Sequence, residues 1–364
     1  MTIYDEVLSF IEAPKQACFE ALALQVFRHQ FDTVSPYREY CQSRGVNPNR
    51  IDSIDRIPPL STVAFKYADL TDSVTPLPAA GGRTFSTSGT TAGPDERGRH
   101  RVPCVDIYRA SAVGHLRRML FADGARMLVL SLHPTADRMP ESSLGQMISW
   151  AMEEFGLGQG RCVADRKGVD TVAAIDVLRG AQRDRAPVCV MTTTAALAAL
   201  FDALRTAHAR LALPAGSRLM DTGGAKGQRL PLGADEVVER SVALLGLEPS
   251  CVINEYGMTE MCSQLYDATP FNSRRADDPA RRRKLGPPWL DAAAVDPISL
   301  ERVPDGNPGL LRFFDLANVG SISAILTGDL GVVENGLVQV IGRAADGEAR
   351  GCALGIEQFA AKDR

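Results

Sequence analysis

The sequence predicts an α/β fold in which a doubly wound, mostly parallel sheet is followed by a smaller β-rich part. Over residues 126–255, short apolar runs alternate with stretches of helical periodicity, and the connections are short. The last third changes to Gly- and Pro-rich turns between short β-type runs. The 364 residues allow two or three domains or one large α/β unit. A composition of 45% hydrophobic and 23% charged residues is that of an ordinary globular protein.

The N-terminal part is predicted to be helical. Pro14 divides the first 30 residues into two short helices. Ser35 followed by Pro36 is typical of an N-cap and the first helical position, and Gly45 ends that helix. A proline-rich connection follows at residues 57–60.

The central and C-terminal elements are predicted from periodicity. We expect strands at residues 126–132, 188–192, 217–221 and 250–255. We expect helices at residues 143–155, 171–184, 195–207 and 235–245. The β-rich part is predicted from runs at residues 311–314, 322–326 and 338–341.

Charge and cysteine usage restrict the partners. The net charge of −4 disfavours nucleic acid as the main partner, and the basic cluster at residues 281–284 is interpreted as a solvated loop rather than a phosphate-binding patch. Residues 1–10 lack signal-peptide features, and no apolar run reaches the ~18 residues of a membrane span. The eight cysteines contain no C-x-x-C pair. We therefore expect a cytoplasmic protein with reduced thiols and no membrane partner.

The first stretch whose residues could bind a ligand is Phe85-Ser-Thr-Ser-Gly-Thr-Thr-Ala-Gly-Pro94. Its small residues let the backbone approach an anion, and its hydroxyl and N–H groups can surround phosphate oxygens. By composition alone an ordinary loop is the competing interpretation.

A second stretch runs from Asn254 to Glu260 at the end of a predicted strand. A carboxylate there suits a Mg²⁺ ion bound to nucleotide phosphates.

A third stretch is Thr327-Gly328-Asp329-Leu330-Gly331, followed by Gly342-Arg343. An Asp can accept bonds from both ribose hydroxyls, although an Asp-Gly turn between strands is the alternative.

Together these stretches resemble the AMP-forming adenylate-forming superfamily. The loop at 85–94 is similar to its Ser-Gly-Thr-Thr-Gly motif, residues 256–260 to Tyr-Gly-x-Thr-Glu, and Thr327–Asp329 with Arg343 to its ribose motif. Gly223-Gly224-Ala225 resembles its adenine-binding stretch. Residues 58–66 and 142–145 resemble the bacterial acyl-protein synthetases of the bioluminescence fatty acid reductase complex. The resemblance implies doubly wound mixed sheets in a large adenylating domain with a smaller β-rich subdomain.

The resemblance also implies ATP and Mg²⁺ as cofactors and a role for each matching residue. Thr259 would hold the α-phosphate, Glu260 the Mg²⁺, and Asp329 the ribose, with Arg343 beside it. The other nucleotide-binding positions would be Thr87, Ser88, Gly89, Thr90, Thr91, Gly223, Gly224, Ala225, Tyr256 and Gly257.

Positive charge at the phosphates has to come from elsewhere, because the phosphate-loop lysine of many relatives is missing here. We expect Arg97, Arg99 or His100 to supply it, with Lys66 and Lys226 as weaker candidates. His133 is interpreted either as a residue lining the acid pocket or as a turn histidine.

The C-terminus leads to an expectation about the acyl acceptor. The chain stops soon after Arg350-Gly351-Cys352, where longer relatives continue into a mobile domain. We therefore expect residues 1–342 to form the adenylating domain and residues 343–364 a short remnant of the truncated mobile domain. The resemblance implies that Cys352 takes the acyl group as a nucleophile and passes it to a partner such as an acyl reductase. We expect Cys18, Cys189 and Cys251 to be buried hydrophobic residues instead.

The sequence thus predicts ATP-dependent activation of a carboxylic acid, most readily a fatty acid, followed by acyl transfer to a thiol. One alternative is transfer to CoA or to the phosphopantetheine of a carrier protein, with Cys352 only structural. A second alternative is a catalytically silent subunit that binds nucleotide or a partner.

Overall fold

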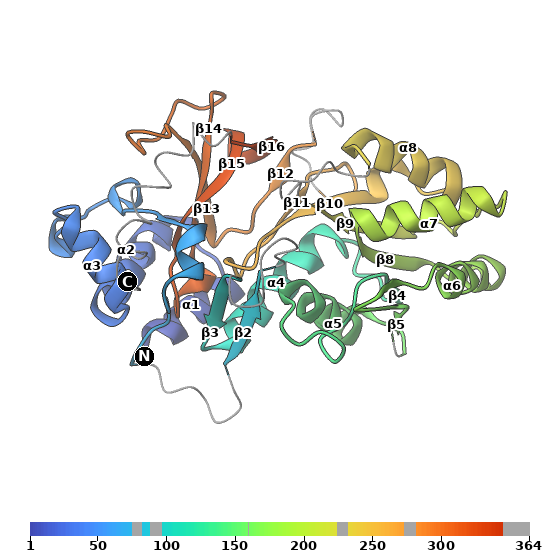
Figure 1. Cartoon of the computed structure of the whole chain (residues 1–364), viewed down its shortest axis with the longest axis horizontal. Helices are drawn as coiled ribbons and strands as arrows, with labels where there is room; N and C mark the ends of the chain where they lie inside the picture. The colour runs from blue at the N-terminus through green and yellow to red at the C-terminus, as the bar shows by residue number, and fades with distance from the viewer. Residues whose placement is uncertain (75–81, 88–96, 159, 224–231, 273–281, 345–364) are drawn as a thin grey trace. The chain divides into compact units, whose positions relative to one another are not determined.

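Two units make up the described part of the chain. The computed structural model describes residues 1–74, 82–87, 97–158, 160–223, 232–272 and 282–344 (Figure 1). The first unit comprises Met1–Gly114, Met258–Gln264 and Leu285–Arg364. The second comprises His115–Gly257 and Leu265–Lys284.

The second unit is built on a largely parallel sheet. Its strands are, in spatial order, β5 (Arg161–Cys162), β4 (Leu128–Ser131), β8 (Val188–Thr193), β9 (Arg218–Thr222), β10 (Val252–Tyr256) and β11 (Leu265–Asp267). The pairs from β5 to β10 are parallel, and β11 runs antiparallel to β10. Strand β8 is buried along almost its whole length, as expected for a strand covered on both faces.

Four helices accompany these strands. They are α5 (Ser143–Phe155), α6 (Thr171–Asp184), α7 (Thr194–Thr206) and α8 (Ala234–Leu245), and Figure 1 shows α7 and α8 on the opposite side of β8 from α5. Ser142, Asp170 and Thr193 cap α5, α6 and α7 by accepting backbone N–H bonds. Gly246, with φ +68°, ends α8 in the left-handed conformation. The short strands β6 (Ala164–Asp165) and β7 (Gly168–Val169) form a separate hairpin.

The first unit contains the antiparallel β-rich part. Strands β13 (Leu290–Val295), β14 (Pro308–Asp315), β15 (Ala324–Glu334) and β16 (Leu337–Arg343) pair in that order. The short strand β1 (Leu60–Ser61) adds to β15 in parallel. Strands β2 (Arg83–Ser86) and β3 (Arg99–Val102) form a hairpin of their own. Strand β12 (Lys284–Leu285) spans the boundary between the units.

The helices of the first unit lie before this sheet in sequence. They are α1 (Ile3–Glu12), α2 (Phe19–Thr33) and α3 (Ser35–Ser43), and α4 (Val105–Met119) begins in this unit. Short 3₁₀ helices are η1 (Gln16–Cys18), η2 (Pro48–Arg50), η3 (Ile54–Arg56), η4 (Thr62–Lys66) and η8 (Leu316–Asn318), and η6 (Pro249–Cys251) lies in the second unit. No helix within the described ranges is both long and apolar enough to cross a membrane.

The predicted α/β class, the four central helices and the β-rich last third are confirmed. Two local predictions are wrong. Ser35 is the first residue of α3 and gives no capping bond, because Val34 occupies the cap position. The strand expected at 322–326 extends to Glu334, so Thr327-Gly328-Asp329 lies inside β15 and forms no turn. Helix α4 and the β2–β3 hairpin were not predicted.

The proposed boundary at residue 342 lies within β16, and residues 345–364 of the expected remnant lie outside the described residues. That division of the chain stays a prediction.

Candidate functional site

The glycine- and hydroxyl-rich stretch begins in β2 and lies between β2 and β3 in the sequence. Thr87 N donates to Gly98 O at 2.9 Å, and Gly98 N donates to Thr87 Oγ1 at 3.0 Å. These two bonds close the neck of the hairpin on either side of residues 88–96. A Cβ added to Gly98 would lie 3.6 Å from the Lys66 side chain, so this lysine lies beside the neck. The expected positions Ser88, Gly89, Thr90 and Thr91 lie outside the described residues.

His100 connects this hairpin to the Thr259–Glu260 segment within the first unit. It pairs across the hairpin with Phe85, and its Nδ1 lies 2.8 Å from the carbonyl oxygen of Thr259. The ring is 2% exposed and contacts Phe65 edge-on. Burial lowers the pKa of His100 to about 4, so the imidazole is neutral at pH 7. His100 is therefore not a source of positive charge at the phosphates, and that expectation is wrong. Arg97 is half-buried and Arg99 is exposed.

Thr259 and Glu260 are both buried, with exposures of 9% and 8%. The carbonyl of Glu260 accepts a bond from Asn318 Nδ2 at 2.8 Å. Both side chains carry oxygen atoms, and oxygen atoms are the ligands that Mg²⁺ prefers, also when it is bound to phosphate. Within the described ranges, no group of three or more His, Cys, Asp or Glu side chains could hold a metal ion. An ion held mainly by phosphate oxygens needs only one or two protein carboxylates, and Glu260 fits that requirement.

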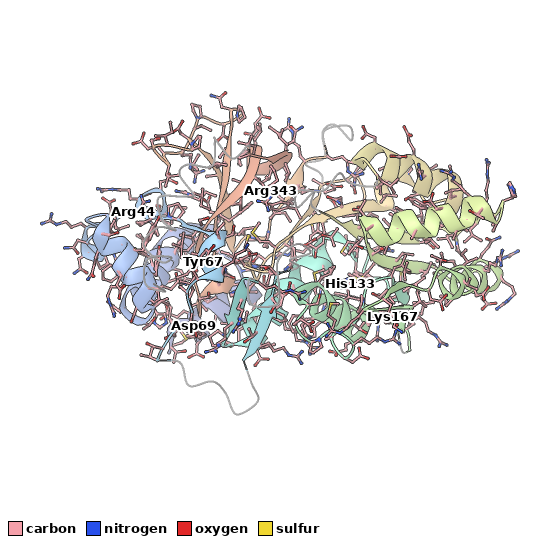
Figure 2. All side chains as sticks on the ribbon, viewed as in Figure 1. Arg44, Tyr67, Asp69, His133, Lys167 and Arg343 are labelled. Atoms are coloured by element: carbon pink, nitrogen blue, oxygen red, sulfur yellow. The ribbon has the colours of Figure 1, made fainter. Side chains whose placement is uncertain are left out.

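Asp329 and Arg343 face each other across β15 and β16. Arg343, at the end of β16 (Figure 2), places Nε 3.2 Å from Asp329 Oδ1. The side chain of Asp329 is 18% exposed and that of Arg343 is 49% exposed. Gly328 leaves the space for the guanidinium, since a Cβ there would lie 2.6 Å from Nη1. The structure therefore brings the two residues of the expected ribose motif together.

The second unit carries the remaining expected residues at the carboxyl ends of β9 and β10. Thr222 donates to Glu255, which lies beside it in the parallel register. Gly223 follows β9, Tyr256 is the last residue of β10, and Gly257 comes directly after it. Burial raises the pKa of Glu255 to about 7, although Thr222 and Lys284 oppose this rise. Gly224 and Ala225, as well as Lys226, lie outside the described residues.

A buried polar network lies next to Glu255 along the chain. Lys284 Nζ donates to Asn254 Oδ1 and Asp267 Oδ1, each at 2.7 Å. Arg282 also pairs with Asp267, and Asn254 Nδ2 lies 3.1 Å from Asp221 Oδ2. The solvated-loop interpretation of the basic cluster is therefore wrong for Arg282 and Lys284, which both pair with Asp267 inside the second unit.

His133 holds the start of α5. Its Nε2 lies 3.0 Å from Ser142 Oγ, the hydroxyl that caps this helix (His133 is labelled in Figure 2). Burial lowers the pKa of His133 to about 4. These contacts favour the turn-histidine interpretation over a role in the acid pocket.

The cysteines within the described ranges divide by burial. Cys41, Cys189, Cys251 and Cys262 are buried. Burial raises the pKa of Cys41 and of Cys189 to about 12 and also raises the pKa of Cys251. The expectation for Cys189 and Cys251 is thus confirmed, whereas Cys18 is exposed and that expectation is wrong. Cys352 lies outside the described residues.

Sequence reasoning missed the residues that fasten the Thr259–Glu260 segment. Asp315 is the last residue of β14 and Asn318 is the last residue of η8, and both are buried. No motif marks them in the sequence, because their role depends on contacts between residues more than fifty positions apart.

A protein family and several known proteins are similar to this chain. The family described as "Acyl-protein synthetase, LuxE" matches residues 3–360. A long-chain-fatty-acid–luciferin-component ligase of Vibrio harveyi is 35% identical over 85 residues, which are 21% of this chain and 22% of that protein. Its counterpart from Aliivibrio fischeri is 33% identical over 91 residues, 22% of this chain and 24% of that protein. Each alignment thus spans less than a quarter of the relative's own length.

Solved structures share the fold at low identity. A 2-hydroxyisobutyryl-CoA ligase in complex with 2-HIB-AMP and CoA has a TM-score of 0.65 at 16% identity, covering 90% of this chain and 70% of that one. The same ligase in its thioesterification state has a TM-score of 0.63 at 17% identity, covering 94% and 68%. With the family match extending over nearly the whole sequence, the chain belongs to the LuxE acyl-protein synthetase family.

Proposed function

We propose that this protein uses ATP to activate a carboxylic acid and then transfers the acyl group to a thiol. The observation that carries the proposal is the family match over residues 3–360. In the first step a carboxylate oxygen attacks the α-phosphorus of ATP, and the bond to pyrophosphate breaks. In the second step a thiolate attacks the acyl carbonyl carbon, a thioester forms, and AMP leaves with the bonding electron pair. The names of the relatives support a long-chain fatty acid as the substrate.

The residues of the first unit have separate roles in this proposal. Asp329 binds the ribose hydroxyls, and Arg343 orients its carboxylate through the ion pair. The hydroxyl of Thr259 donates a hydrogen bond to the α-phosphate. Glu260 holds Mg²⁺ together with phosphate oxygens. When bound, Mg²⁺ supplies charge neutralisation at the phosphates. Lys66, beside the neck of the β2–β3 hairpin, is the cation we assign to the phosphate loop.

We further propose that Cys352 is the acyl acceptor and that a partner with its own thiol, such as an acyl reductase, receives the group. The chemistry of the other cysteines supports this choice. A thiolate is the nucleophile, and burial in apolar surroundings disfavours it at Cys41, Cys189 and Cys262. Cys104 and Cys162 are half-buried, and Cys18, the exposed cysteine of the described residues, serves as the matched control.

A second candidate acceptor is CoA or the phosphopantetheine of a carrier protein. It is favoured by the fold likeness to a ligase whose structure contains CoA. In that case Cys352 would be structural, and the adenylation step would be unchanged.

The test is an incubation of the full chain with ATP, Mg²⁺ and fatty acids of graded length, followed by intact mass measurement. Wild type, Cys352→Ala and Cys18→Ala are compared, and pyrophosphate release is measured in parallel. We expect a hydroxylamine-labile acyl adduct on wild type and Cys18→Ala and no adduct on Cys352→Ala.

Two other outcomes decide between the alternatives. Pyrophosphate release that depends on the acid but leaves no adduct would favour CoA or a carrier protein as acceptor. Folded protein that releases no pyrophosphate with any acid would refute the adenylation proposal and favour a silent nucleotide- or partner-binding subunit.

A further inference from the structure

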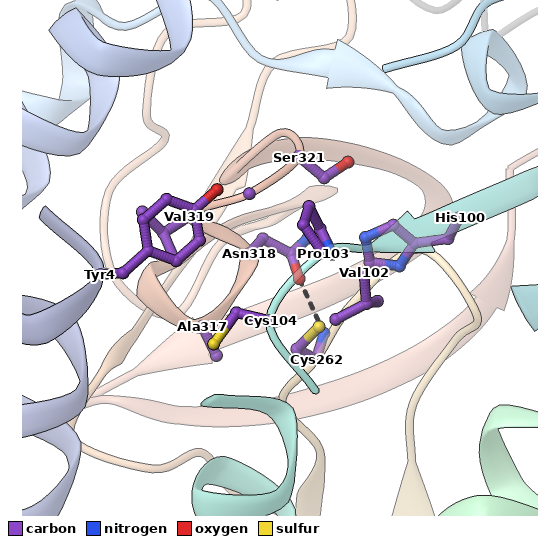
Figure 3. A pocket seen from close by; sticks show the side chains of 11 residues that line it. Tyr4, His100, Val102, Pro103, Cys104, Cys262, Ala317, Asn318, Val319 and Ser321 are labelled. Carbon is purple, nitrogen blue, oxygen red and sulfur yellow. Dashed lines mark hydrogen bonds between the residues drawn. The ribbon is translucent and has the colours of Figure 1, made fainter. Parts of the chain in front are cut away.

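The backbone from Thr259 to Ser263 is fastened by three buried side chains that are distant in sequence. His100 bonds the carbonyl of Thr259 at 2.8 Å, and Asn318 donates to the next carbonyl, that of Glu260, at 2.8 Å. Asn318 also accepts from Cys262 N at 2.8 Å (Figure 3). Asp315 accepts from Cys262 N and from Ser263 N at 3.1 and 2.9 Å. Carbonyl groups and N–H groups of this segment are therefore both hydrogen-bonded to side chains, and all these residues belong to the first unit.

These side chains are themselves held in place. Asn318 donates to Ile322 O at 2.9 Å, and its own carbonyl accepts from Gln30 Nε2 at 3.0 Å. Asp315 also accepts from Ser263 Oγ at 2.7 Å. Asn318 and Asp315 are 1% and 0% exposed. Such buried polar groups lower the free energy of folding only if each finds partners, so this network fixes one backbone path for residues 259–263.

The contact of His100 determines its tautomer. A carbonyl oxygen can only accept, so Nδ1 carries the ring proton and Nε2 carries a lone pair. Nε2 is buried and has no hydrogen-bond partner among the described residues. His100 lines a cavity of about 10 Å³ together with Cys104, Cys262 and Asn318 (Figure 3), which is room for about one water molecule.

We infer that His100 and Asn318 are positioning residues for adenylation, which set the directions of the Thr259 and Glu260 side chains through the carbonyl groups of these same residues. The inference rests on the proposed function. His100 belongs to β3 of the β2–β3 hairpin, so its bond also ties that hairpin to the Thr259–Glu260 segment. Misplacement of a reacting group by about 1 Å can reduce the rate about 100-fold. Loss of this bond should therefore lower kcat more strongly than it weakens substrate binding.

The decisive comparison is between His100→Asn and His100→Gln. The Asn amide nitrogen can take the place of Nδ1 and still donate to Thr259 O, whereas the Gln amide reaches the position of Nε2. We expect acid-dependent ATP–pyrophosphate exchange to stay within about threefold of wild type in His100→Asn and to fall roughly 10- to 100-fold in kcat in His100→Gln. The KM for ATP and the melting temperature should be similar in both variants.

The second carbonyl is tested with Asn318→Asp, which keeps the acceptor for Cys262 N and removes the donor to Glu260 O. We expect a higher Mg²⁺ concentration for half-maximal exchange, since Glu260 is the proposed Mg²⁺ carboxylate. An unchanged Mg²⁺ requirement in the folded variant would overturn the role of Asn318.

A readout independent of activity is the ¹⁵N NMR spectrum of the histidine side chains. We expect one neutral imidazole protonated at Nδ1 at pH 7, assigned to His100 by its absence from either variant. If neither variant folds, substitutions of the other four of the five histidines assign it by exclusion. A His100 protonated at Nε2 would overturn the inference, and so would equal exchange rates in His100→Gln and wild type. Wild-type protein without any exchange would instead refute the proposed function.

Discussion

Asp329 and Arg343 form an ion pair across directly opposed positions of β15 and β16, with 3.2 Å between Oδ1 and Nε. The pair is only partly buried, so its own contribution to folding is small, about 0–1 kcal/mol. Its geometry depends on Gly328, because any side chain at that position would take the space of the guanidinium. A pair that contributes little to folding and yet requires a glycine beside it is consistent with a role in binding.

Gly328→Ala should raise the KM for ATP without unfolding the protein. The added methyl group lies 2.6 Å from Nη1, and the half-exposed Arg343 side chain can move away from Asp329. We expect an increase in KM of about threefold to tenfold, less than for Asp329→Ala, where loss of charged hydrogen bonds worth about 1.5–3 kcal/mol predicts roughly 10- to 100-fold. Asp52→Ala, which breaks the exposed Arg56–Asp52 pair, is the control and should leave KM unchanged. Equal KM values for all these variants would contradict the ribose role.

Glu260→Gln should raise the Mg²⁺ requirement of pyrophosphate exchange. The change keeps the volume of a buried side chain and its backbone carbonyl bond to Asn318 but removes the carboxylate charge. We expect at least a tenfold higher Mg²⁺ concentration for half-maximal rate, about 1.4 kcal/mol of lost ion binding. The exposed Glu239 provides the matched control, and Glu239→Gln should titrate like wild type. A Glu260→Gln curve that overlays wild type would remove Glu260 from the metal site.

How far the sequence predicted this arrangement depends on the range of the contacts involved. The central helices follow from local periodicity and caps, and the Asp329–Arg343 pair follows from a motif whose two parts lie on adjacent strands. Asp315, Asn318 and the bond from His100 to Thr259 are different, because residues 53 to 159 positions apart meet there. No local pattern encodes such contacts, since they depend on how the hairpin, η8 and the 258–264 segment pack together.

Glu255→Gln should change how stability depends on pH. The folded-state pKa of Glu255 is about 7, against an ordinary value of 4.5, and burial is the main cause. Between these values the folded protein binds more protons than the unfolded chain, so this group's stabilisation is present below pH 4.5 and is lost as the pH rises through 7. Urea unfolding at pH 5 and pH 8 should therefore show that the variant lacks a decrease of about 1–3 kcal/mol that wild type shows. The same decrease in the variant would assign the effect to other groups, and Glu239→Gln should behave as wild type.

Gly145→Ala and Gly180→Ala should change the free energy of unfolding in opposite directions. Both glycines lie in helices, α5 and α6, and differ in their surroundings. A Cβ at Gly145 would lie 2.5 Å from the backbone oxygen of Pro134, whereas at Gly180 the nearest atom is a flexible Arg183 nitrogen at 3.8 Å.

For Gly145→Ala, helix α5 must move away from the turn at His133 and Pro134, and the bond from His133 to the capping Ser142 should weaken with it. Overpacking against backbone predicts a loss of about 1–3 kcal/mol. For Gly180→Ala, the lower entropy of the unfolded chain and the higher helix propensity of alanine predict a gain of about 0.5–1 kcal/mol. Urea unfolding of both variants measures the two effects on one scale. If Gly145→Ala were as stable as wild type, the start of α5 would not be packed against Pro134 as tightly as these distances require.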